Sequence, residues 1–149
     1  MNKETRKTKG ARLLRVLVVF IFLFLGLAKL ALTVQYGLEP YTLLIDQLGL
    51  PTVFSYYGVV AMLIEFYFVV GVWSGKAFSS STAMAILLTG AGLTLSVMLL
   101  VYRQDSDCGC GLLGENEYGL LAQKLILLLM LVALLKVKNR LFITPTQSK

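Results

Sequence analysis

Two cysteines separated by one glycine are the residues of this chain best suited to chemistry. Cys108 and Cys110 are its only cysteines, and they flank Gly109. Alpha carbons two residues apart in a bent chain can fall within the separation of about 4.4–6.8 Å that a disulfide requires. Such a small ring is strained, and strain makes a disulfide easier to reduce. The pair therefore favours thiol–disulfide exchange, while a fixed structural bridge and two free thiols without a role stay open as alternatives.

Acidic residues surround the cysteine pair. They are Asp105, Asp107, Glu115 and Glu117. Negative charge nearby disfavours the thiolate, which is the form of cysteine that attacks a disulfide. This neighbourhood counts against a highly reactive pair.

Three ionisable residues, Lys29, Glu65 and Lys124, lie inside long apolar stretches. At about 1.5 Å of rise per helical residue, they occupy similar depths in a membrane. An unpaired charge at the centre of a bilayer costs about 2.5–3.5 kcal/mol, so we expect Glu65 to pair with one of the two lysines. One interpretation is a structural ion pair, or a lysine that extends to the headgroups. The other is a charged cluster that binds a polar head, a quinone or an acidic group of a partner.

The composition excludes several classes of site and of protein. The chain has no histidine, which removes histidine-ligated haem and zinc and histidine general bases. A structural zinc site needs about four ligands and the chain offers two thiols, so no metal site is expected. The net charge of +6 is not arranged as a basic face interleaved with aromatic residues, so no nucleic-acid partner is expected.

The elements that position these residues are apolar and long. Hydrophobic residues make up 57% of the 149 residues and charged residues 15%, and the mean hydropathy is +0.77. Such a chain is typical of a protein embedded in a bilayer. The sequence predicts an all-α membrane protein, a four-helix transmembrane bundle with spans at about 13–34, 57–73, 82–102 and 120–137.

Two further features concern single elements. Between the first two spans, Pro40 and Pro51 bracket a helical stretch over 41–50 that is too short to cross a bilayer, so we expect it to lie at the membrane interface. On the third span, small residues recur at helical spacing, which favours close packing of a neighbouring helix. These residues are Ala85, Thr89, Gly92 and Ser96.

The distribution of Lys and Arg predicts the orientation. Eleven of the fourteen lie before or at the start of the first span, between spans two and three, or at or after the end of span four, with Arg15 and Lys136 counted at the edges of their spans; the opposite side carries Arg103 alone. By the positive-inside rule both termini are cytoplasmic (N-in/C-in) and the cysteine loop is periplasmic or otherwise extracytoplasmic. The chain then divides into a basic cytoplasmic N-terminus (1–12), a membrane domain (13–137) and a cytoplasmic tail (138–149). A cleaved signal peptide is the alternative for the first span, but the apolar run extends to about Val34 without a good cleavage site.

Several short motifs resemble the DoxX-like superfamily of small four-helix membrane proteins. They are Gly26-Leu27-Ala28-Lys29-Leu30, Leu48-Gly49-Leu50-Pro51, and Glu65 with Gly71. The Cys108-Gly109-Cys110 loop resembles the branch of methylamine-utilisation protein MauE specifically. That branch typically continues with Phe-Gly, where this chain has Gly111-Leu112-Leu113-Gly114. The resemblance covers nearly the whole chain.

The resemblance implies a multi-pass accessory protein of the inner membrane. In that role it helps a periplasmic thioredoxin-like partner to mature a disulfide-containing client in amine or methylamine metabolism. DoxX relatives imply instead a quinone-linked oxidoreductase subunit, and quinone is the one candidate cofactor. A non-catalytic assembly or anchoring protein with a structural loop disulfide is a further alternative, as is a small-molecule pore or carrier lined by the charged cluster. Whether the chain is an enzyme is left open by its sequence.

Overall fold

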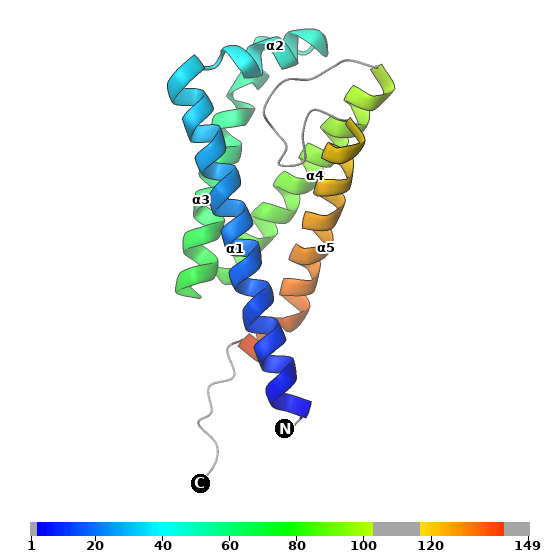
Figure 1. The fold of residues 1–149 in the computed structure, drawn as a ribbon. Helices are drawn as coiled ribbons and strands as arrows, with labels where there is room; N and C mark the ends of the chain where they lie inside the picture. The colour runs from blue at the N-terminus through cyan, green and yellow to red at the C-terminus, as the bar shows by residue number, and fades with distance from the viewer. Residues whose placement is uncertain (1–2, 103–116, 142–149) are drawn as a thin grey trace.

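The computed structural model describes residues 3–102 and 117–141, and all the regular elements in these ranges are helical. Figure 1 shows four long helices side by side, with a short helix lying across one end of them. The elements, in chain order, are α1 (Lys3–Tyr36), α2 (Glu39–Gln47), a 3-10 turn η1 (Thr52–Tyr56), α3 (Tyr57–Ser74), α4 (Phe78–Tyr102) and α5 (Glu117–Leu141).

The four long helices form a closed bundle in which each has two neighbours. Helix α1 packs against α3 and α5, and α4 packs against the same two helices from the other side. Four helical stretches of 21–28 residues are apolar and long enough to cross a membrane. At 1.5 Å per residue, 21 residues span about 30 Å, the thickness of a hydrocarbon core. The prediction of an all-α four-helix bundle is confirmed.

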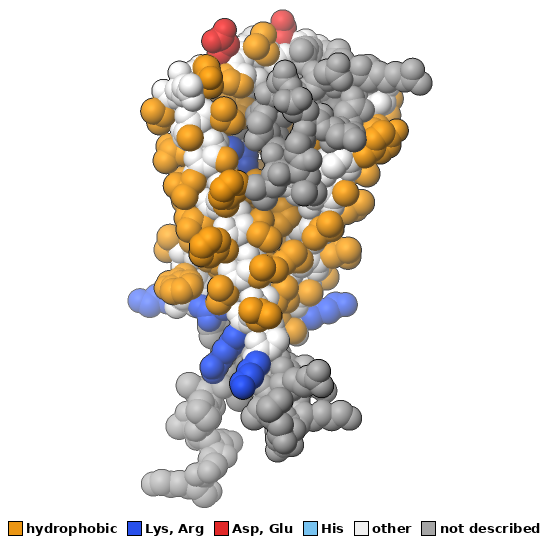
Figure 2. All heavy atoms as spheres, in the orientation of Figure 1, with side chains coloured by type: hydrophobic (Ala, Val, Ile, Leu, Met, Phe, Trp, Pro, Cys, Tyr) orange, Lys and Arg blue, Asp and Glu red, His pale blue; other side chains and the backbone are white. Residues whose placement is uncertain are grey.

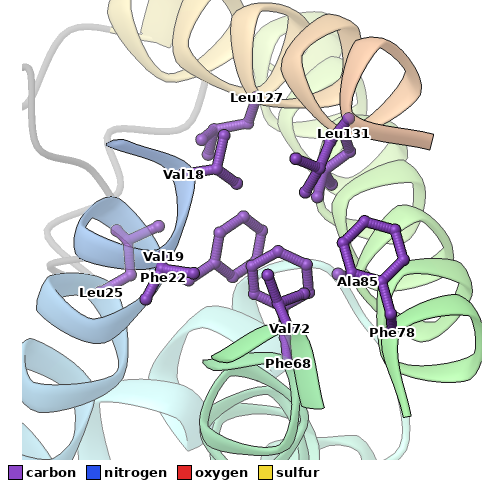
Figure 3. Close-up of a cluster of buried hydrophobic side chains, with 11 residues drawn as sticks. Val18, Val19, Phe22, Leu25, Phe68, Val72, Phe78, Ala85, Leu127 and Leu131 are labelled. Carbon is purple, nitrogen blue, oxygen red and sulfur yellow. The ribbon is translucent and has the colours of Figure 1, made fainter. Parts of the chain in front are cut away.

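Each helix buries a stripe of residues spaced three or four apart, which is the period of one helical face. The largest buried side chains meet in a single apolar core, and Figure 3 shows how they interlock. Phe22 and Phe68 lie at its centre with ring centroids 4.5 Å apart. The same stripe on α1 continues from Phe22 through Leu25 to Lys29. The periodicity that builds the core therefore also places the first ionisable residue inside the bundle.

The outward faces of the long helices are also apolar. Large hydrophobic side chains such as Phe20, Leu63, Leu87 and Leu129 are more than half exposed. Figure 2 shows this apolar surface along the sides of the bundle, with Lys and Arg near the end that carries the termini and Asp and Glu at the α2 end. A surface of this kind suits lipid and not water. The chain is a multi-pass membrane protein.

Helix α2 crosses the end of the bundle between two tight turns. Gly37 and Gly49 adopt positive φ angles of 64° each, a conformation that residues with a side chain rarely tolerate. Pro40 occupies the first turn of the helix, where its missing N–H is not needed. The predicted short helix is present, but it covers Glu39–Gln47 instead of 41–50 because Gly49 ends it in the left-handed conformation.

Helix α4 begins earlier than the sequence suggested, at Phe78 and not at about residue 82. The intervening serines can belong to a helix because their hydroxyls bond to its own carbonyl groups. Ser80 Oγ donates to the Ala77 carbonyl at 3.2 Å, and Ser81 Oγ donates to the Phe78 carbonyl at 3.3 Å. Serine hydroxyls can donate in this way to a nearby carbonyl, so each of these two side chains has an acceptor within its own helix turn.

Candidate functional site

The loop that carries the cysteines joins the ends of two neighbouring helices. Cys108 and Cys110 lie outside the described residues, between the last residue of α4, Tyr102, and the first of α5, Glu117. Both of these helix ends lie at the end of the bundle that α2 crosses (Figure 1). The chemistry predicted for the pair stays a prediction, and the described part of the site is the bundle interior near this end.

An ion pair joins α1 to α3 inside the bundle. Lys29 Nζ donates a hydrogen bond to Glu65 Oε1 at 2.6 Å. The two side chains are 8% and 4% exposed, respectively, so the bond is almost completely shielded. Each residue lies on the buried stripe of its helix, Lys29 one turn beyond Leu25 and Glu65 between Ala61 and Phe68. The structure thus brings together two of the three ionisable residues at hydrogen-bonding distance.

The third ionisable residue, Lys124 of α5, lies beside this pair. It lines the same cavity and interacts electrostatically with Glu65. Its aliphatic stem passes close to Gly92 of α4, since a Cβ on that glycine would lie 3.4 Å from Lys124 Cε and 3.5 Å from Tyr57 Oη. Two ammonium groups and one carboxylate therefore share one interior space, to which all four long helices contribute.

That space is a cavity in the half of the bundle nearest α2. Its volume is about 50 Å³, counted as the space that the centre of a water molecule can reach. Among the residues that the structure describes, its polar lining consists of the three ionisable residues and the hydroxyls of Tyr57, Thr89 and Ser96, and most of the rest is aliphatic. At its inner end Phe22 and Leu127 line the cavity, and both belong to the apolar core. The core therefore separates the cavity from the end of the bundle that holds the termini.

Three oxygen atoms on the cavity lining can each accept a further hydrogen bond. Glu65 Oε2 is buried and has no hydrogen-bond partner among the residues that the structure describes. Thr89 Oγ1 donates to the Ala85 carbonyl at 2.7 Å, and Ser96 Oγ donates to the Gly92 carbonyl at 2.8 Å. Because each hydroxyl has a single hydrogen, both can only accept a further bond from the cavity. This lining suits an occupant that donates hydrogen bonds.

Sequence reasoning found the charged residues of the cavity and missed most of its uncharged polar ones. Lys29, Glu65 and Lys124 stand out because charge is rare within apolar runs. Thr89 and Ser96 were predicted only to pack against a neighbouring helix, and residue 57 only to begin the second span. A shared helical face on α4 was visible in the sequence, but nothing there indicated that the face borders an open space.

Nothing in the described ranges resembles a metal centre, since they contain no group of three or more Cys, Asp or Glu side chains that could hold an ion. The described charges of the cavity are two ammonium groups and one carboxylate. Ammonium groups repel a cation and are not metal ligands in their charged form. The cavity is therefore suited to a hydrogen-bonding role and not to metal coordination.

Comparison with known proteins connects most of the chain to one family. The family model described as "Methylamine utilisation protein MauE" matches residues 7–137, a range that includes α3, α4, most of α1 and α5, and the segment between α4 and α5. No curated protein matches the chain. No solved structure matches it either.

Proposed function

The chain belongs to the methylamine utilisation protein MauE family, and on that premise we propose that it is a membrane accessory protein that exchanges thiols and disulfides with an extracytoplasmic partner. The partner is a thioredoxin-like protein that in turn acts on a disulfide-containing client. The observation that carries the proposal is the position of Cys108 and Cys110, the only cysteines of the chain, in the loop between two membrane-spanning helices. A pair so placed can meet a water-soluble protein without leaving the membrane.

The proposed exchange balances without any further reagent. One cysteine thiolate attacks the disulfide of the partner, which forms a mixed disulfide and releases one partner thiolate. The second cysteine of the pair then attacks the mixed disulfide and releases the other partner thiolate. The partner gains two electrons and the Cys108–Cys110 pair loses two as its own disulfide forms. The reverse sequence oxidises the partner, and the relative reduction potentials decide the direction.

The orientation required for this exchange is supported by the charges at the two ends of the bundle. Lys76 and Lys138 lie together at the end that carries the termini, whereas Glu39 and Asp46 are exposed at the α2 end. By the positive-inside rule the first end faces the cytoplasm, so α2 and the cysteine loop face the other side. We propose on this basis that residues 1–12 and 138–149 are cytoplasmic, and the family implies that the membrane is the inner (cytoplasmic) membrane.

The charged cavity lies close to the proposed exchange site along the helix axis. Lys124 is seven residues after the start of α5, and Ser96 is six residues before the end of α4. At 1.5 Å per residue these separations are each about 10 Å. Lys29, Glu65 and Lys124 lie toward the helix ends that flank the cysteine segment, and positive charge near a cysteine favours the thiolate, which supports the proposal.

A non-catalytic role is the second candidate, and the acidic residues of the loop favour it. Asp107 adjoins Cys108, and three further acids lie within the same segment. Their charge opposes formation of the thiolate, which suits a permanent disulfide that shapes a docking surface. In this role the protein anchors or assembles its partner at the membrane without changing the oxidation state of that partner.

Trapping the mixed disulfide tests the proposal. In a Cys110→Ser variant the resolving thiol is absent, so the intermediate between Cys108 and the partner should accumulate and appear as a larger species on a non-reducing gel. The matched Cys108→Ser variant tests the opposite order of attack, and the double variant is the control that should trap nothing. Wild-type cysteines that stay fully reduced in cells, with no trapped species from either single variant, would contradict the exchange. A loss of protein abundance in Cys108→Ala with unchanged partner oxidation would support the anchoring role.

A further inference from the structure

One carboxylate oxygen in the cavity, Glu65 Oε2, is buried without a hydrogen-bond donor among the described residues. Glu65 Oε1 accepts from Lys29, but Oε2 of the same carboxylate has no partner within the described part of the chain. The side chain is 4% exposed. A buried carboxylate oxygen without a donor is strongly disfavoured, and such groups are almost always satisfied by protein or by ordered water. Something that donates a hydrogen bond should therefore occupy the space next to Oε2.

The size of the cavity limits what that occupant can be. A buried water needs about 10–15 Å³ measured in this way, so a volume of about 50 Å³ holds about three to five waters. A cavity that binds benzene has about 150 Å³. The space is therefore about one third of what a six-membered ring requires, and a quinone head does not fit the cavity as the structure has it.

The polar groups around the cavity meet the needs of water. A buried water is held by about two to four hydrogen-bonding partners. Glu65 Oε2 and the hydroxyl oxygens of Thr89 and Ser96 supply acceptors, and they are joined on the lining by Tyr57 and by the ammonium groups. Water can donate to the first set and accept from the second. An apolar molecule would leave Glu65 Oε2 without a donor.

The cavity lies toward one end of the bundle. Its lining includes Tyr57 at the start of α3 and Leu120 near the start of α5, both toward the α2 end of the bundle. Toward the other end the tilted, closely packed rings of Phe22 and Phe68 and the buried Val72 fill the bundle. The cavity therefore lies nearer the aqueous phase on the α2 side, and the apolar core excludes water on the other.

We propose that the cavity is a binding site for a cluster of about three to five waters, which donate to Glu65 Oε2 and exchange with the aqueous phase on the α2 side. The cluster keeps the Lys29–Glu65 pair solvated within the membrane and accessible to protons and small polar solutes from that side. The ligand class of the site is water and not a ring-sized head group. This inference does not depend on the thiol exchange proposed above.

Cysteine reactivity measures hydration at a chosen position, because only the thiolate attacks a methanethiosulfonate and a thiolate forms only where water solvates it. The attack joins the cysteine sulfur to the reagent's thiomethyl group and releases methanesulfinate. The variant is Ser96→Cys in a Cys108→Ser, Cys110→Ser background, so the test is separate from any redox activity. The reagent is neutral methyl methanethiosulfonate, which enters lipid and water alike. Differences in rate therefore report on hydration and not on access.

Two positions serve as controls in the same background. Thr94→Cys lies on α4 two residues from Ser96 but on the exposed, lipid-facing side, and Tyr118→Cys is exposed at the start of α5. We expect Ser96→Cys to react at least about tenfold faster than Thr94→Cys, and Tyr118→Cys to react fastest. Reaction of Ser96→Cys no faster than Thr94→Cys, with Tyr118→Cys reactive, would overturn the proposal. If Ser96→Cys does not fold, Thr89→Cys takes its place, since Thr89 lines the same cavity.

Two further comparisons locate the water and limit the size of the ligand. A Gly92→Leu change extends a side chain into the cavity and should bring the Ser96→Cys rate down to that of Thr94→Cys. Gly90→Leu on the same helix is its control, because a Cβ there meets nothing within 4 Å. Benzyl methanethiosulfonate should modify Tyr118→Cys readily and Ser96→Cys at least about tenfold more slowly than the methyl reagent. Equal rates for the two reagents at Ser96→Cys would show a cavity that admits rings and would overturn the assignment to water.

Discussion

The Lys29–Glu65 bond shows how the bundle accommodates charge. Each group alone would be costly at this depth, and their 2.6 Å contact with little exposure offsets much of that cost. Such a pair adds little stability compared with two apolar residues of similar size. The pair affects stability mainly when it is broken, because removal of one partner leaves the other charge buried and uncompensated.

Variants of the pair should therefore be strongly non-additive. Glu65→Leu leaves the Lys29 ammonium without its carboxylate and should lower the free energy of unfolding by about 3–5 kcal/mol. The double variant Lys29→Leu, Glu65→Leu removes both charges and should lose less than Glu65→Leu alone. Unfolding of purified protein by SDS titration measures both. Asp46→Ala, at an exposed position of α2, is the control and should change stability by no more than about 0.5 kcal/mol. A double variant as unstable as the sum of its single variants would show that the two charges act independently.

The sequence predicted that Glu65 pairs with Lys29 or Lys124 without deciding between them, and it did not identify the uncharged residues that share the cavity. A lysine or glutamate in an apolar run is conspicuous because lipid selects against it, so Lys29 and Glu65 could be found without a structure. A tyrosine at the start of a span is equally common at any membrane interface, so Tyr57 carried no signal for its position on the cavity. Arg15 is a similar case. It was counted only as a cytoplasmic charge, but its guanidinium donates to the carbonyls of Val72 and Trp73 at 2.7 Å each, at the end of α3.

The attachment of α2 to the bundle depends on one glycine. Tyr41 of α2 is 3% exposed, and a Cβ on Gly58 of α3 would overlap atoms of its ring. The absence of a side chain at Gly58 is thus what allows the tyrosine to seat α2 across the end of the helices. The short helix was predictable from its flanking prolines, whereas the contact that holds it was not, because tyrosine and glycine are distant in the sequence.

Gly58→Ala should consequently loosen α2. The added methyl group forces the Tyr41 ring to move, and overpacking of this kind costs about 1–3 kcal/mol. Gly90→Ala is the matched control within α4, where open space surrounds the new methyl group and replacement of a helical glycine should stabilise by about 0.5–1 kcal/mol. Opposite changes in the SDS unfolding midpoint are therefore expected for the two variants. Faster proteolysis near Gly37 or Gly49 in Gly58→Ala would identify α2 as the element released, and unchanged stability would contradict the seating role of Tyr41.

The bundle as a whole was the most predictable property of the chain. Lipid requires every backbone polar group to be satisfied within its own segment, so long apolar runs have few alternatives to spanning helices. The same argument does not specify which helices become neighbours, and the order around the bundle came from the structure. Because α1 contacts both α3 and α5, Lys29 lies on the same interior space as Lys124. From the sequence this arrangement was possible but not required.

Orientation is the property of the whole molecule that thiol labelling tests most directly. With reductant supplied, a membrane-impermeant maleimide should label Cys108 and Cys110 in intact cells, since the positive-inside rule places their loop outside. A single cysteine introduced as Lys76→Cys in a background free of Cys108 and Cys110 should be labelled only after the cells are opened. Labelling of the native pair that requires lysis would invert the proposed topology and remove the basis for an extracytoplasmic partner.

The packed Phe22–Phe68 pair has an electrical consequence. A membrane potential falls mainly across dry, weakly polarisable material, and the packed core beneath the cavity is the dry part of this bundle. With waters reaching Glu65 from the α2 side as proposed, the carboxylate is at nearly the same potential as the solution on that side. A full crossing of the field is worth about 2.3 kcal/mol per charge for each 100 mV. A proton that arrives at Glu65 from the α2 side gains or loses only a small part of this energy, so the voltage across the membrane should have little influence on the charge state of the pair.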